Sequence, residues 1–315
     1  MKKYILKRIL IMIPVFLGMT ALVFFLSNMT PGSPVDAMIT PEMGVEDVEQ
    51  LRHEMGLDQP IYVQYFKWLE RLFQGNLGYS YRTSNPVIKD IGERIGPTLI
   101  LTLTVLVVSI LFGVALGVLA ACKPYSIWDT LASGLSFIGS SMPGFFIALV
   151  LIYFFSVKLR WLPTGGMYTS VTSNSFSDLM RHMVLPTISM SLASSGNYIR
   201  QTRSAMLEVM GEEYVKMARA KGLRERVVLY VHALRNAMLP IVTCIGMSVP
   251  GLVGGSIIIE QIFGWPGMGT LMVLSVTYRD YPVIMGITMY ITIAVLLTNL
   301  LMDLLYAVLD PRIRN

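Results

Sequence analysis

The chain has 315 residues, of which 54% are hydrophobic and only 14% are charged, and its formal net charge is +5. A soluble domain is about one-quarter charged, so this composition excludes an ordinary soluble protein and indicates a membrane protein. Because lipid admits only segments that satisfy their own backbone hydrogen bonds, the natural unit of organisation is the membrane-spanning helix.

Uncharged apolar runs of bilayer length predict five membrane-spanning helices. These runs cover residues 9–29, 97–121, 130–157, 237–259 and 281–302. A sixth run, residues 183–199, is shorter and richer in serine and glycine, so we expect a weaker span that faces protein over much of its surface. The sequence therefore predicts an all-α integral membrane protein with six transmembrane helices.

The first run follows Lys2, Lys3, Lys7 and Arg8, a basic start like that of a signal peptide. Its apolar core is too long for a signal peptide and no small-x-small cleavage pattern follows, so we expect a retained anchor. With this start in the cytoplasm, six spans place both termini and the loop 200–236 on the cytoplasmic side. The cytoplasmic segments then hold 15 Lys and Arg against 7 Asp and Glu, and the external segments hold 10 against 13. That asymmetry agrees with the positive-inside rule.

The segment between the first two spans contains two amphipathic helical patterns. Their apolar positions are Val45, Val48, Leu51 and Met55 in "VEDVEQLRHEMGL", and Ile61, Tyr65, Trp68, Leu69 and Leu72 in "IYVQYFKWLERLF". Two interpretations stay open. The segment is either a small external platform that receives a partner, or a pair of helices that lie on the membrane surface and brace the spans.

Several function classes lack the residues that they need. No G-x-x-x-x-G-K-[ST] pattern occurs, so the chain supplies no ATPase of its own. The span interiors contain no Asp, Glu, Lys or Arg, which argues against ion coupling within the membrane. We expect Glu260 and Asp303, both at span ends, to lie at the interface. We expect "FGWPGMG" to form a tight external turn rather than a nucleotide-binding loop.

The histidines and cysteines lack the spacing typical of a metal or haem site. His53, His182 and His232 are scattered, and we expect each at a surface or an interface. Cys122 and Cys244 fall in or at the end of predicted spans, so we expect small buried apolar residues rather than a disulfide. The sequence predicts no metal, catalytic or cofactor-binding residue in this chain.

Polar residues inside the predicted spans allow two interpretations. They are Ser136, Ser140, Ser141, Ser194, Ser195 and Asn197. In the first, a polar passage is lined by Ser140, Ser141, Ser194 and Asn197. In the second, these small residues let helices approach closely and hydrogen-bond across the contact. The pairs Gly113 with Gly117 and Gly251 with Gly255 have the small-x-x-x-small spacing that favours the second interpretation.

Residues 212–240, "EEYVKMARAKGLRERVVLYVHALRNAMLP", form a charged segment between two apolar runs. The acidic start and the basic end of its first part complement a helix dipole, and Gly222 offers the left-handed conformation that ends a helix. A second helix is predicted, with one apolar face formed by Leu223, Val227, Tyr230, Val231 and Leu234. The segment is either a basic amphipathic helix on anionic lipid or a rigid docking handle for a soluble partner.

"EYVKMARAKGL" followed by "HALRNAMLP" resembles the cytoplasmic loop of permease subunits of ABC importers, in the dipeptide, oligopeptide and nickel permease family. The resemblance covers nearly the whole chain and includes the B-type oligopeptide permease subunits. It rests on "YILKRIL", "PGSP", "GLDQPIYVQYFKWL", "GNLGYSYRT", "ERIGPTLILTL", "LRWLPTGG", "FGWPGMG" and "DLLYAVLDPRIR" in this order. Lys216, Met217 and Ala218 stand where the wider importer consensus has an acidic residue and two alanines. Leu239 and Pro240 also lie farther downstream than in sugar permeases, which argues against a sugar importer.

The resemblance implies a type I ABC importer permease fold in the cell (cytoplasmic) membrane. Residues 1–30 would hold the N-terminal end and first span, residues 31–96 an extracytoplasmic segment, and residues 97–315 a five-helix core with a coupling loop at 205–236. It also implies a coupling helix that docks onto a cytoplasmic ATPase, formed by Glu213, Tyr214, Val215, Lys216, Met217, Ala218, Arg219, Ala220, Lys221 and Gly222.

The implied partners are a second homologous permease, two cytoplasmic ATPases, an extracytoplasmic substrate-binding protein and membrane lipid, with no nucleic acid. ATP and Mg would be bound by the ATPases, and this chain would carry no cofactor. The expected function is therefore that of a transmembrane subunit, which forms the pathway for di- or oligopeptides in an ATP-driven importer. Import of nickel or glutathione stays open within the family. From another class, a channel or membrane scaffold stays open, in which the charged segment is only a membrane-surface helix.

Overall fold

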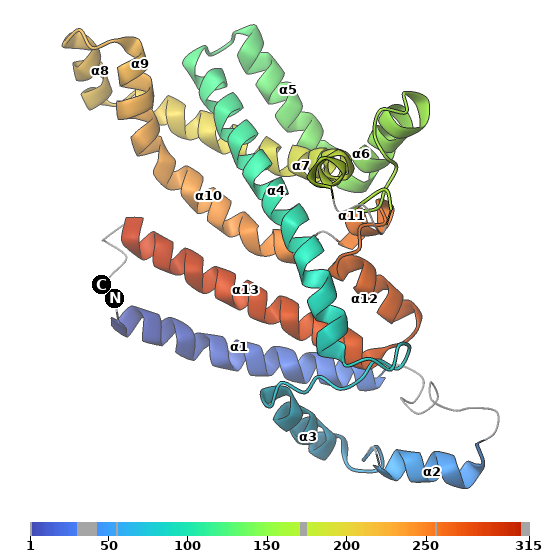
Figure 1. The fold of residues 1–315 in the computed structure, drawn as a ribbon. Helices are drawn as coiled ribbons and strands as arrows, with labels where there is room; N and C mark the ends of the chain where they lie inside the picture. Colours follow the sequence, from blue (N-terminus) through green and yellow to red (C-terminus); the bar gives the residue numbers. More distant parts are fainter. Residues whose placement is uncertain (1, 30–42, 55, 171–174, 256, 310–315) are drawn as a thin grey trace. The chain divides into compact units, whose positions relative to one another are not determined.

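The computed structural model describes residues 2–29, 43–54, 56–170, 175–255 and 257–309, and within them the regular secondary structure is helical. In chain order (Figure 1) the elements are α1 (Lys2–Met29), α2 (Val45–Glu54), α3 (Ile61–Phe73), α4 (Val87–Cys122), α5 (Ile127–Ser141), α6 (Gly144–Leu151), η2 (Ile152–Lys158), α7 (Phe176–Met210), α8 (Glu213–Ala220), α9 (Glu225–Val227), η3 (Val228–Ala233), α10 (Leu234–Gly255), α11 (Ile257–Ile262), α12 (Met268–Thr277) and α13 (Tyr281–Leu309). The elements η2 and η3 are π-helices. The all-α prediction is confirmed.

The chain divides into two compact units. The first comprises Met1–Gly96 with Gly267–Leu300, and the second comprises Pro97–Pro266 with Leu301–Asn315. The candidate site described below belongs to the second unit.

In the first unit, α1 packs against α3 and α13 through Val23, Phe24, Trp68 and Met289. A second cluster joins the start of α4 to α12 and α13, and its buried members are Val87, Ile91, Met268, Leu271, Val283 and Ile287. Both amphipathic helices predicted between the first two spans are present as α2 and α3, although Met55 lies outside the described residues. On α3 the buried residue is Trp68, whereas Ile61 is 42% exposed.

In the second unit, α7 is the central helix and packs against α5, α6 and α10. Glycines of α4 let this helix approach α7 closely, as the sequence predicted for Gly113 and Gly117. A Cβ atom on Gly113 would lie 2.5 Å from Tyr198 Cβ, and one on Gly117 would lie 2.5 Å from Thr202 Cβ. The surroundings of Gly251 and Gly255 lie outside the described residues.

Among the described residues, three helices are long and apolar enough to cross a membrane, and two bent helix pairs raise the number to as many as five. The three are Ile5–Met29, Val87–Cys122 and Tyr281–Leu304. The predicted sixth span falls within the 35-residue helix α7, whose buried residues include Thr187, Ser189, Ser191 and Ser195. This helix turns polar side chains toward protein, as expected of a weak span, and the count of six stays a prediction.

The apolar run at residues 130–157, predicted as one span, forms two helices with a break between them. Helix α5 ends at Ser141, helix α6 begins at Gly144, and the pair is bent by 107°. Pro143 disfavours the helical conformation at Met142, which adopts an extended φ of −97° and ψ of 131°. Hydropathy detects the apolar run but does not detect the helix break within it.

Two glycine-to-alanine substitutions test the contact between α4 and α7. Gly117→Ala places a methyl group 2.5 Å from Thr202 Cβ and 2.9 Å from the Ile199 carbonyl oxygen, so we expect about 1–3 kcal/mol of destabilisation from overpacking. Gly134→Ala on α5 meets nothing within 4 Å, so we expect a stabilisation of about 0.5–1 kcal/mol from reduced unfolded-state entropy. The melting temperatures of the two variants in detergent should move in opposite directions. An equal shift for both would contradict the close approach.

Candidate functional site

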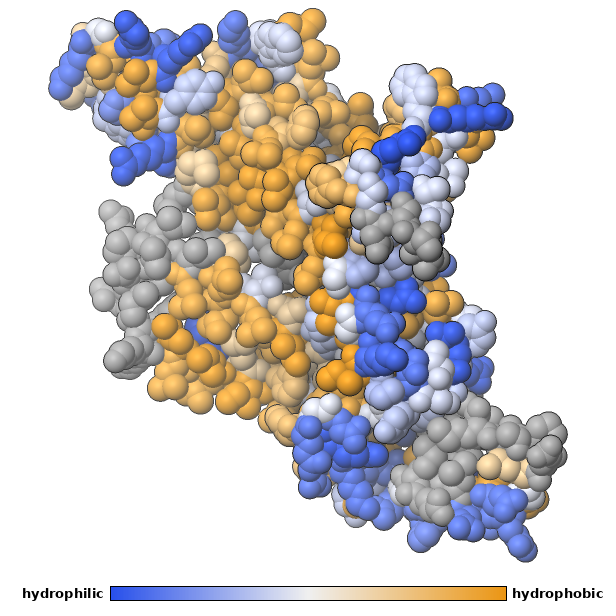
Figure 2. All heavy atoms as spheres, viewed as in Figure 1, coloured by the Kyte–Doolittle hydropathy of each residue, from blue (hydrophilic) through white to orange (hydrophobic). Residues whose placement is uncertain are grey.

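The charged segment folds as a helical elbow, by which we mean residues 211–227: the turn before α8, α8 itself, the turn at Gly222, and α9. Helix α8 spans Glu213–Ala220, and Gly222 then adopts a φ of +74°. A side chain is strained at that angle, so glycine is what lets the chain reverse here. Figure 2 shows hydrophilic residues gathered over α8 and α9, next to the hydrophobic surface of the neighbouring helices.

A small apolar cluster closes the elbow. Val215 and Ala218 of α8 pack against Val228 of η3 and Val209 of α7, and Val215 and Val228 are fully buried. These two α8 residues are among the ten predicted to dock onto an ATPase, yet they face inward. The exposed apolar residues of α8 are Tyr214, at 42% exposure, and Met217, at 58%. The side of α8 that is free to meet another protein therefore carries Tyr214, Met217 and the exposed Lys216 between them.

The second helix differs from its prediction in the register of its apolar face. Regular helix begins at Glu225, and after Val227 the chain continues as the π-helix η3. A π-helix closes i→i+5 hydrogen bonds, so side chains no longer follow the period of 3.6 residues on which the predicted face was based. Of that face, Leu223, Val227, Tyr230 and Val231 are exposed, whereas the buried residues of η3 are Val228 and Ala233.

An ion pair spans the turn of the elbow. Arg219 Nη2 lies 2.8 Å from Glu225 Oε1, with both side chains partly exposed, and Lys216 Nζ lies 4.0 Å from Glu213 Oε1. Exposed pairs of this kind contribute about 0–1 kcal/mol each. The Arg219–Glu225 pair joins α8 to α9 and so favours one angle of the elbow without being its main source of stability.

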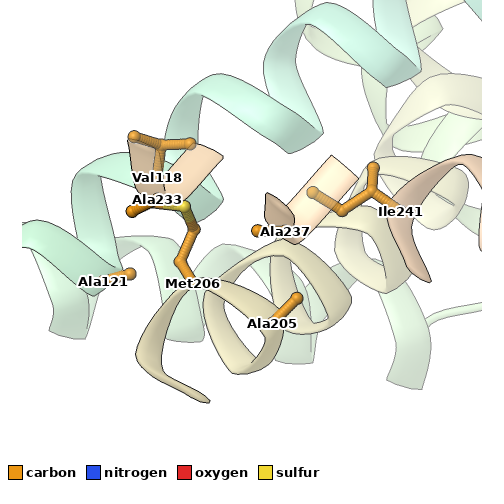
Figure 3. Packing of buried hydrophobic residues seen from close by; sticks show 7 residues of the cluster. All are labelled: Val118, Ala121, Ala205, Met206, Ala233, Ala237 and Ile241. Carbon is orange, nitrogen blue, oxygen red and sulfur yellow. The ribbon is translucent and has the colours of Figure 1, made fainter. Parts of the chain in front are cut away.

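The elbow is anchored to the spans by a cluster of small side chains. Figure 3 shows residues of three segments meeting, with Met206 of α7 extending toward Ala233. The buried members are Val118 and Ala121 of α4, Ala205 and Met206 of α7, and Ala233, Ala237 and Ile241 of η3 and α10. Because alanine side chains are short, the three helices approach closely here. The elbow thus continues through η3 into α10, and η3 and α10 pack against α4 and α7.

An open groove runs between α7 and α10, with a volume of about 740 Å³. Its lining contains no charged side chain and consists of Asn197, Gln201, Pro240, Thr243, Cys244, Met247 and Ser248. Asn197 with Gln201, and Cys244 with Ser248, are each four residues apart, so each pair shares one face of its helix. Sequence reasoning found only Asn197. The other lining residues could be recognised only by pairing one face of α7 with one face of α10. That pairing requires the knowledge that the two helices are neighbours.

The other three predicted passage residues do not line this groove. The Ser140 hydroxyl donates to the Ser136 carbonyl oxygen of its own helix at 2.9 Å and accepts from Arg200 at 3.1 Å. Ser141 is exposed and Ser194 is half-buried. Ser136 and Ser195 join helices instead, because Ser136 donates to the Gly196 carbonyl oxygen at 2.6 Å and Ser195 to that of Ser109 at 3.3 Å.

The structure bears on four further sequence predictions. Glu260, expected at the membrane interface, is fully buried within the protein and accepts a hydrogen bond from Thr98 Oγ1 at 2.8 Å. The chain turns within "FGWPGMG", as predicted. Within this turn Trp265 is fully buried, and its indole N–H donates a hydrogen bond to the Pro97 carbonyl oxygen at 2.9 Å. His182 is also buried, with its Nδ1 2.9 Å from the Asp178 carbonyl oxygen. The cysteines Cys122 and Cys244 are free and half-buried.

Membrane-spanning helices, an uncharged polar groove and an anchored, exposed elbow together define a membrane permease. Residues 113–315 match the family model described as the binding-protein-dependent transport system inner membrane component, and residues 1–102 match the model of its N-terminal region. The chain belongs to this family, the permease subunits of ABC importers. Subunits of this family are not themselves catalytic.

The relatives are similar along their whole length. The chain is 46% identical over 100% of its length and 99% of the other to a protein of Brucella suis biovar 1 whose name proposes a peptide permease. It is 43% identical to the oligopeptide transport system permease protein AppB of Bacillus subtilis, with 99% of each chain covered. It is 39% identical to the glutathione transport system permease protein GsiC of Escherichia coli K12, with 100% of this chain and 99% of the other covered.

Solved structures share the fold at low identity. An inward-facing conformation of the MetNI methionine ABC transporter aligns with a TM-score of 0.58 at 17% identity, over 72% of this chain and 100% of the other. An amino acid ABC transporter with histidines aligns with a TM-score of 0.52 at 16% identity, over 69% and 93%. The expected type I importer permease fold is confirmed by these likenesses.

Two neighbouring valines test the register of η3. Val228→Ala removes fully buried methyl groups from the cluster that closes the elbow, so we expect the local stability of α8 to fall by about 1–3 kcal/mol. Val227→Ala alters a side chain that is 36% exposed and should change it by less than about 0.5 kcal/mol. Amide hydrogen exchange of α8 measures both. A regular α-helix with the predicted apolar face would give the reverse order.

Proposed function

We propose that this chain is a transmembrane subunit of an ATP-driven peptide importer. With a second, homologous permease it would form the passage for di- or oligopeptides, which an extracytoplasmic binding protein delivers. The cargo assignment rests on relatives of 43% to 46% identity named for peptides. The observation that carries the mechanism is the elbow, an exposed helix fixed to membrane-spanning helices by buried contacts.

The elbow would be the docking handle for a cytoplasmic ATPase subunit. Tyr214 and Met217 supply exposed apolar surface that enters a groove on the ATPase, and Lys216 and Arg219 supply charge around it. ATP and Mg would be bound by two such ATPases rather than by this chain. This role puts the elbow and both termini in the cytoplasm and the protein in the cytoplasmic membrane, in agreement with the excess of Lys and Arg in those segments.

Helix α10 would carry the movement from the elbow to the passage. Its residues Ala237 and Ile241 belong to the cluster that anchors the elbow, whereas Thr243 and Met247 line the groove. A pull on α8 would act on η3 through Val228 and then on α10 itself. The elbow and the α10 side of the groove would therefore move together between two positions of the permease.

The groove would be half of the passage. Its hydroxyl and amide groups can hydrogen-bond to the backbone of any peptide, and the absence of charge from its lining leaves no fixed ion to hold a particular side chain. Passage of a peptide requires weak binding of this kind rather than a tight site. Ser140, Ser141 and Ser194 would belong to the passage only if it extends beyond this groove.

Import of glutathione is the second candidate, because relatives named for glutathione transport are 39% identical over the whole chain. Glutathione is itself a small peptide, so the same uncharged groove would serve both. Transport of nickel would need His or carboxylate groups for the metal. The groove lining contains neither, so in this proposal such groups would belong to the binding protein.

A carboxylate introduced on α8 tests the docking handle. Met217→Glu adds a charge at a side chain that is 58% exposed, so the fold should persist while the apolar contact with the ATPase is lost. We expect co-purification of the ATPase and cargo-stimulated ATP hydrolysis to fall at least about tenfold, or about 1.4 kcal/mol. Ala218→Glu is a poorer test because Ala218 packs inside the elbow.

Tyr125→Asp is the matched control. Tyr125 is 95% exposed in the turn between α4 and α5, and aspartate tolerates its φ of 60°. This variant adds one carboxylate on the side of the membrane proposed for the elbow, so its ATPase association should match that of the unaltered chain. Unchanged association in Met217→Glu would mean that α8 is not the handle, and a membrane-surface helix would then be the better account.

Cargo is tested on the reconstituted complex with its co-purifying subunits. Di- and oligopeptides, glutathione and nickel chelates are supplied in turn with the binding protein, and the rate of ATP hydrolysis is measured. Peptides without glutathione's γ-linkage should stimulate hydrolysis. Stimulation by glutathione alone would replace the peptide assignment with the second candidate, and stimulation by nickel chelates alone would overturn both.

A further inference from the structure

The first unit contains a cavity that the proposed import mechanism does not use. It has a volume of about 310 Å³, within the range of small-ligand sites. Its walls come from the last turn of α1, from α3, from the loop before α4 and from the start of α13. The residues that matter below are Asn28, Lys67, Trp68, Arg71, Tyr81 and Tyr281.

The cavity is cationic. Lys67 and Arg71 stand four residues apart on α3, so they share one face of the helix, and both line the cavity. The lining contains no Asp or Glu. Within the described part of the chain, neither cation has a carboxylate partner within 4.0 Å. Two positive charges beside a partly enclosed apolar floor attract an anion more strongly than the same charges do on an open surface.

A buried network holds the opposite wall in place. Asp280 is 1% exposed and accepts hydrogen bonds from the Ser80 hydroxyl and from the backbone amide of Tyr81 at 3.1 Å. Burial and the charge of Asp280 raise the pKa of Tyr81 to about 12. The phenol therefore stays protonated at any physiological pH, so it remains a hydrogen-bond donor at the cavity. This wall is fixed in advance of any ligand.

The cavity also lies where a span ends. Asn28 belongs to the last turn of α1, whose residues Ile5–Met29 are long and apolar enough to cross a membrane. On the same helix Leu22 is 52% exposed, Leu26 55% and Met29 78%, as expected of a surface covered by acyl chains. Trp68 and Tyr281 add aromatic rings, which favour the boundary between lipid and water. Figure 2 shows hydrophilic residues around α3 beside the hydrophobic surface of α1 and α13.

We propose that this cavity binds the phosphate of an anionic phospholipid headgroup, with Lys67 and Arg71 as its cations and the Tyr81 hydroxyl as a further donor. The acyl chains of that lipid lie along the exposed apolar side of α1. A lipid accounts for both halves of the site, the anion-attracting cavity and the adjoining lipid-facing helix. An acidic segment of another protein or a free phosphate ion accounts only for the first half.

The test uses the full chain with its co-purifying subunits in detergent. Phosphatidylglycerol and phosphatidylcholine with identical acyl chains are added, and lipid retention is measured by native mass spectrometry. We expect the complex to retain phosphatidylglycerol preferentially. Lys67→Gln and Arg71→Gln should each weaken its retention about tenfold, because each removes one charge-assisted hydrogen bond, and the double variant should show no preference. Lys89→Gln is the matched control, an exposed cation at the start of α4 that is not part of the cavity lining, and it should leave retention unchanged.

Further arms separate the possible ligands. If inorganic phosphate at millimolar concentration displaces phosphatidylglycerol, the site takes a free anion and the lipid assignment is overturned. Equal retention by the double variant and the unaltered complex also overturns it. So does loss of the binding protein, rather than of lipid, from the double variant, because that outcome makes the cavity a protein-docking site. The measurement needs neither ATP nor cargo, so its failure leaves the import proposal intact.

Discussion

The close approach of α7 to α4 and α5 is the contact on which the second unit depends. Helices surrounded by lipid gain little from burying apolar side chains against one another, so short side chains and hydrogen bonds must hold them together. Here Gly113 and Gly117 admit α7, and Gly139 and Gly196 bring α5 and α7 to backbone contact, with Cβ positions 2.3 Å and 2.8 Å from opposing carbonyl oxygens. Ser136 and Ser195 hydrogen-bond across this joint, and Ser140 accepts from Arg200 of α7.

That joint determines where the elbow and the groove lie. Alanines and Met206 extend the same close packing to the end of α7, where η3 and α10 join it. One side of α10 is therefore held in the unit while the other side is left to line the groove with α7. The polar residues of α7 divide in the same manner. Ser195 turns inward and Asn197 outward, although they are two residues apart in a sequence stretch that looks uniformly small and polar.

The sequence predicted the helical class, the helix α8, its end at Gly222 and the close contacts of Gly113 and Gly117, because each depends on local composition or spacing. The features that it missed depend on distant partners. Glu260 is buried because Thr98, far away in the chain, offers a donor, and a span-end position alone cannot reveal this. The groove requires two helix faces to be paired, and the inward position of Val228 requires knowledge of the π-helix. Pro143 was an indication of the bend in the sequence, but a hydropathy average over the apolar run does not detect a single proline.

The π-helix η3 also sets the direction in which the elbow points. It joins the elbow to α10, and each α-helical residue turns the chain by about 100°. Loss of one residue from η3, which would restore an ordinary α-helix, would rotate α8 by about that angle relative to the span that follows. Tyr214 and Met217 would then face elsewhere, with every contact within α8 itself unchanged. The number of residues in η3 therefore determines the orientation of α8 relative to α10. This length is constrained independently of the residues of α8.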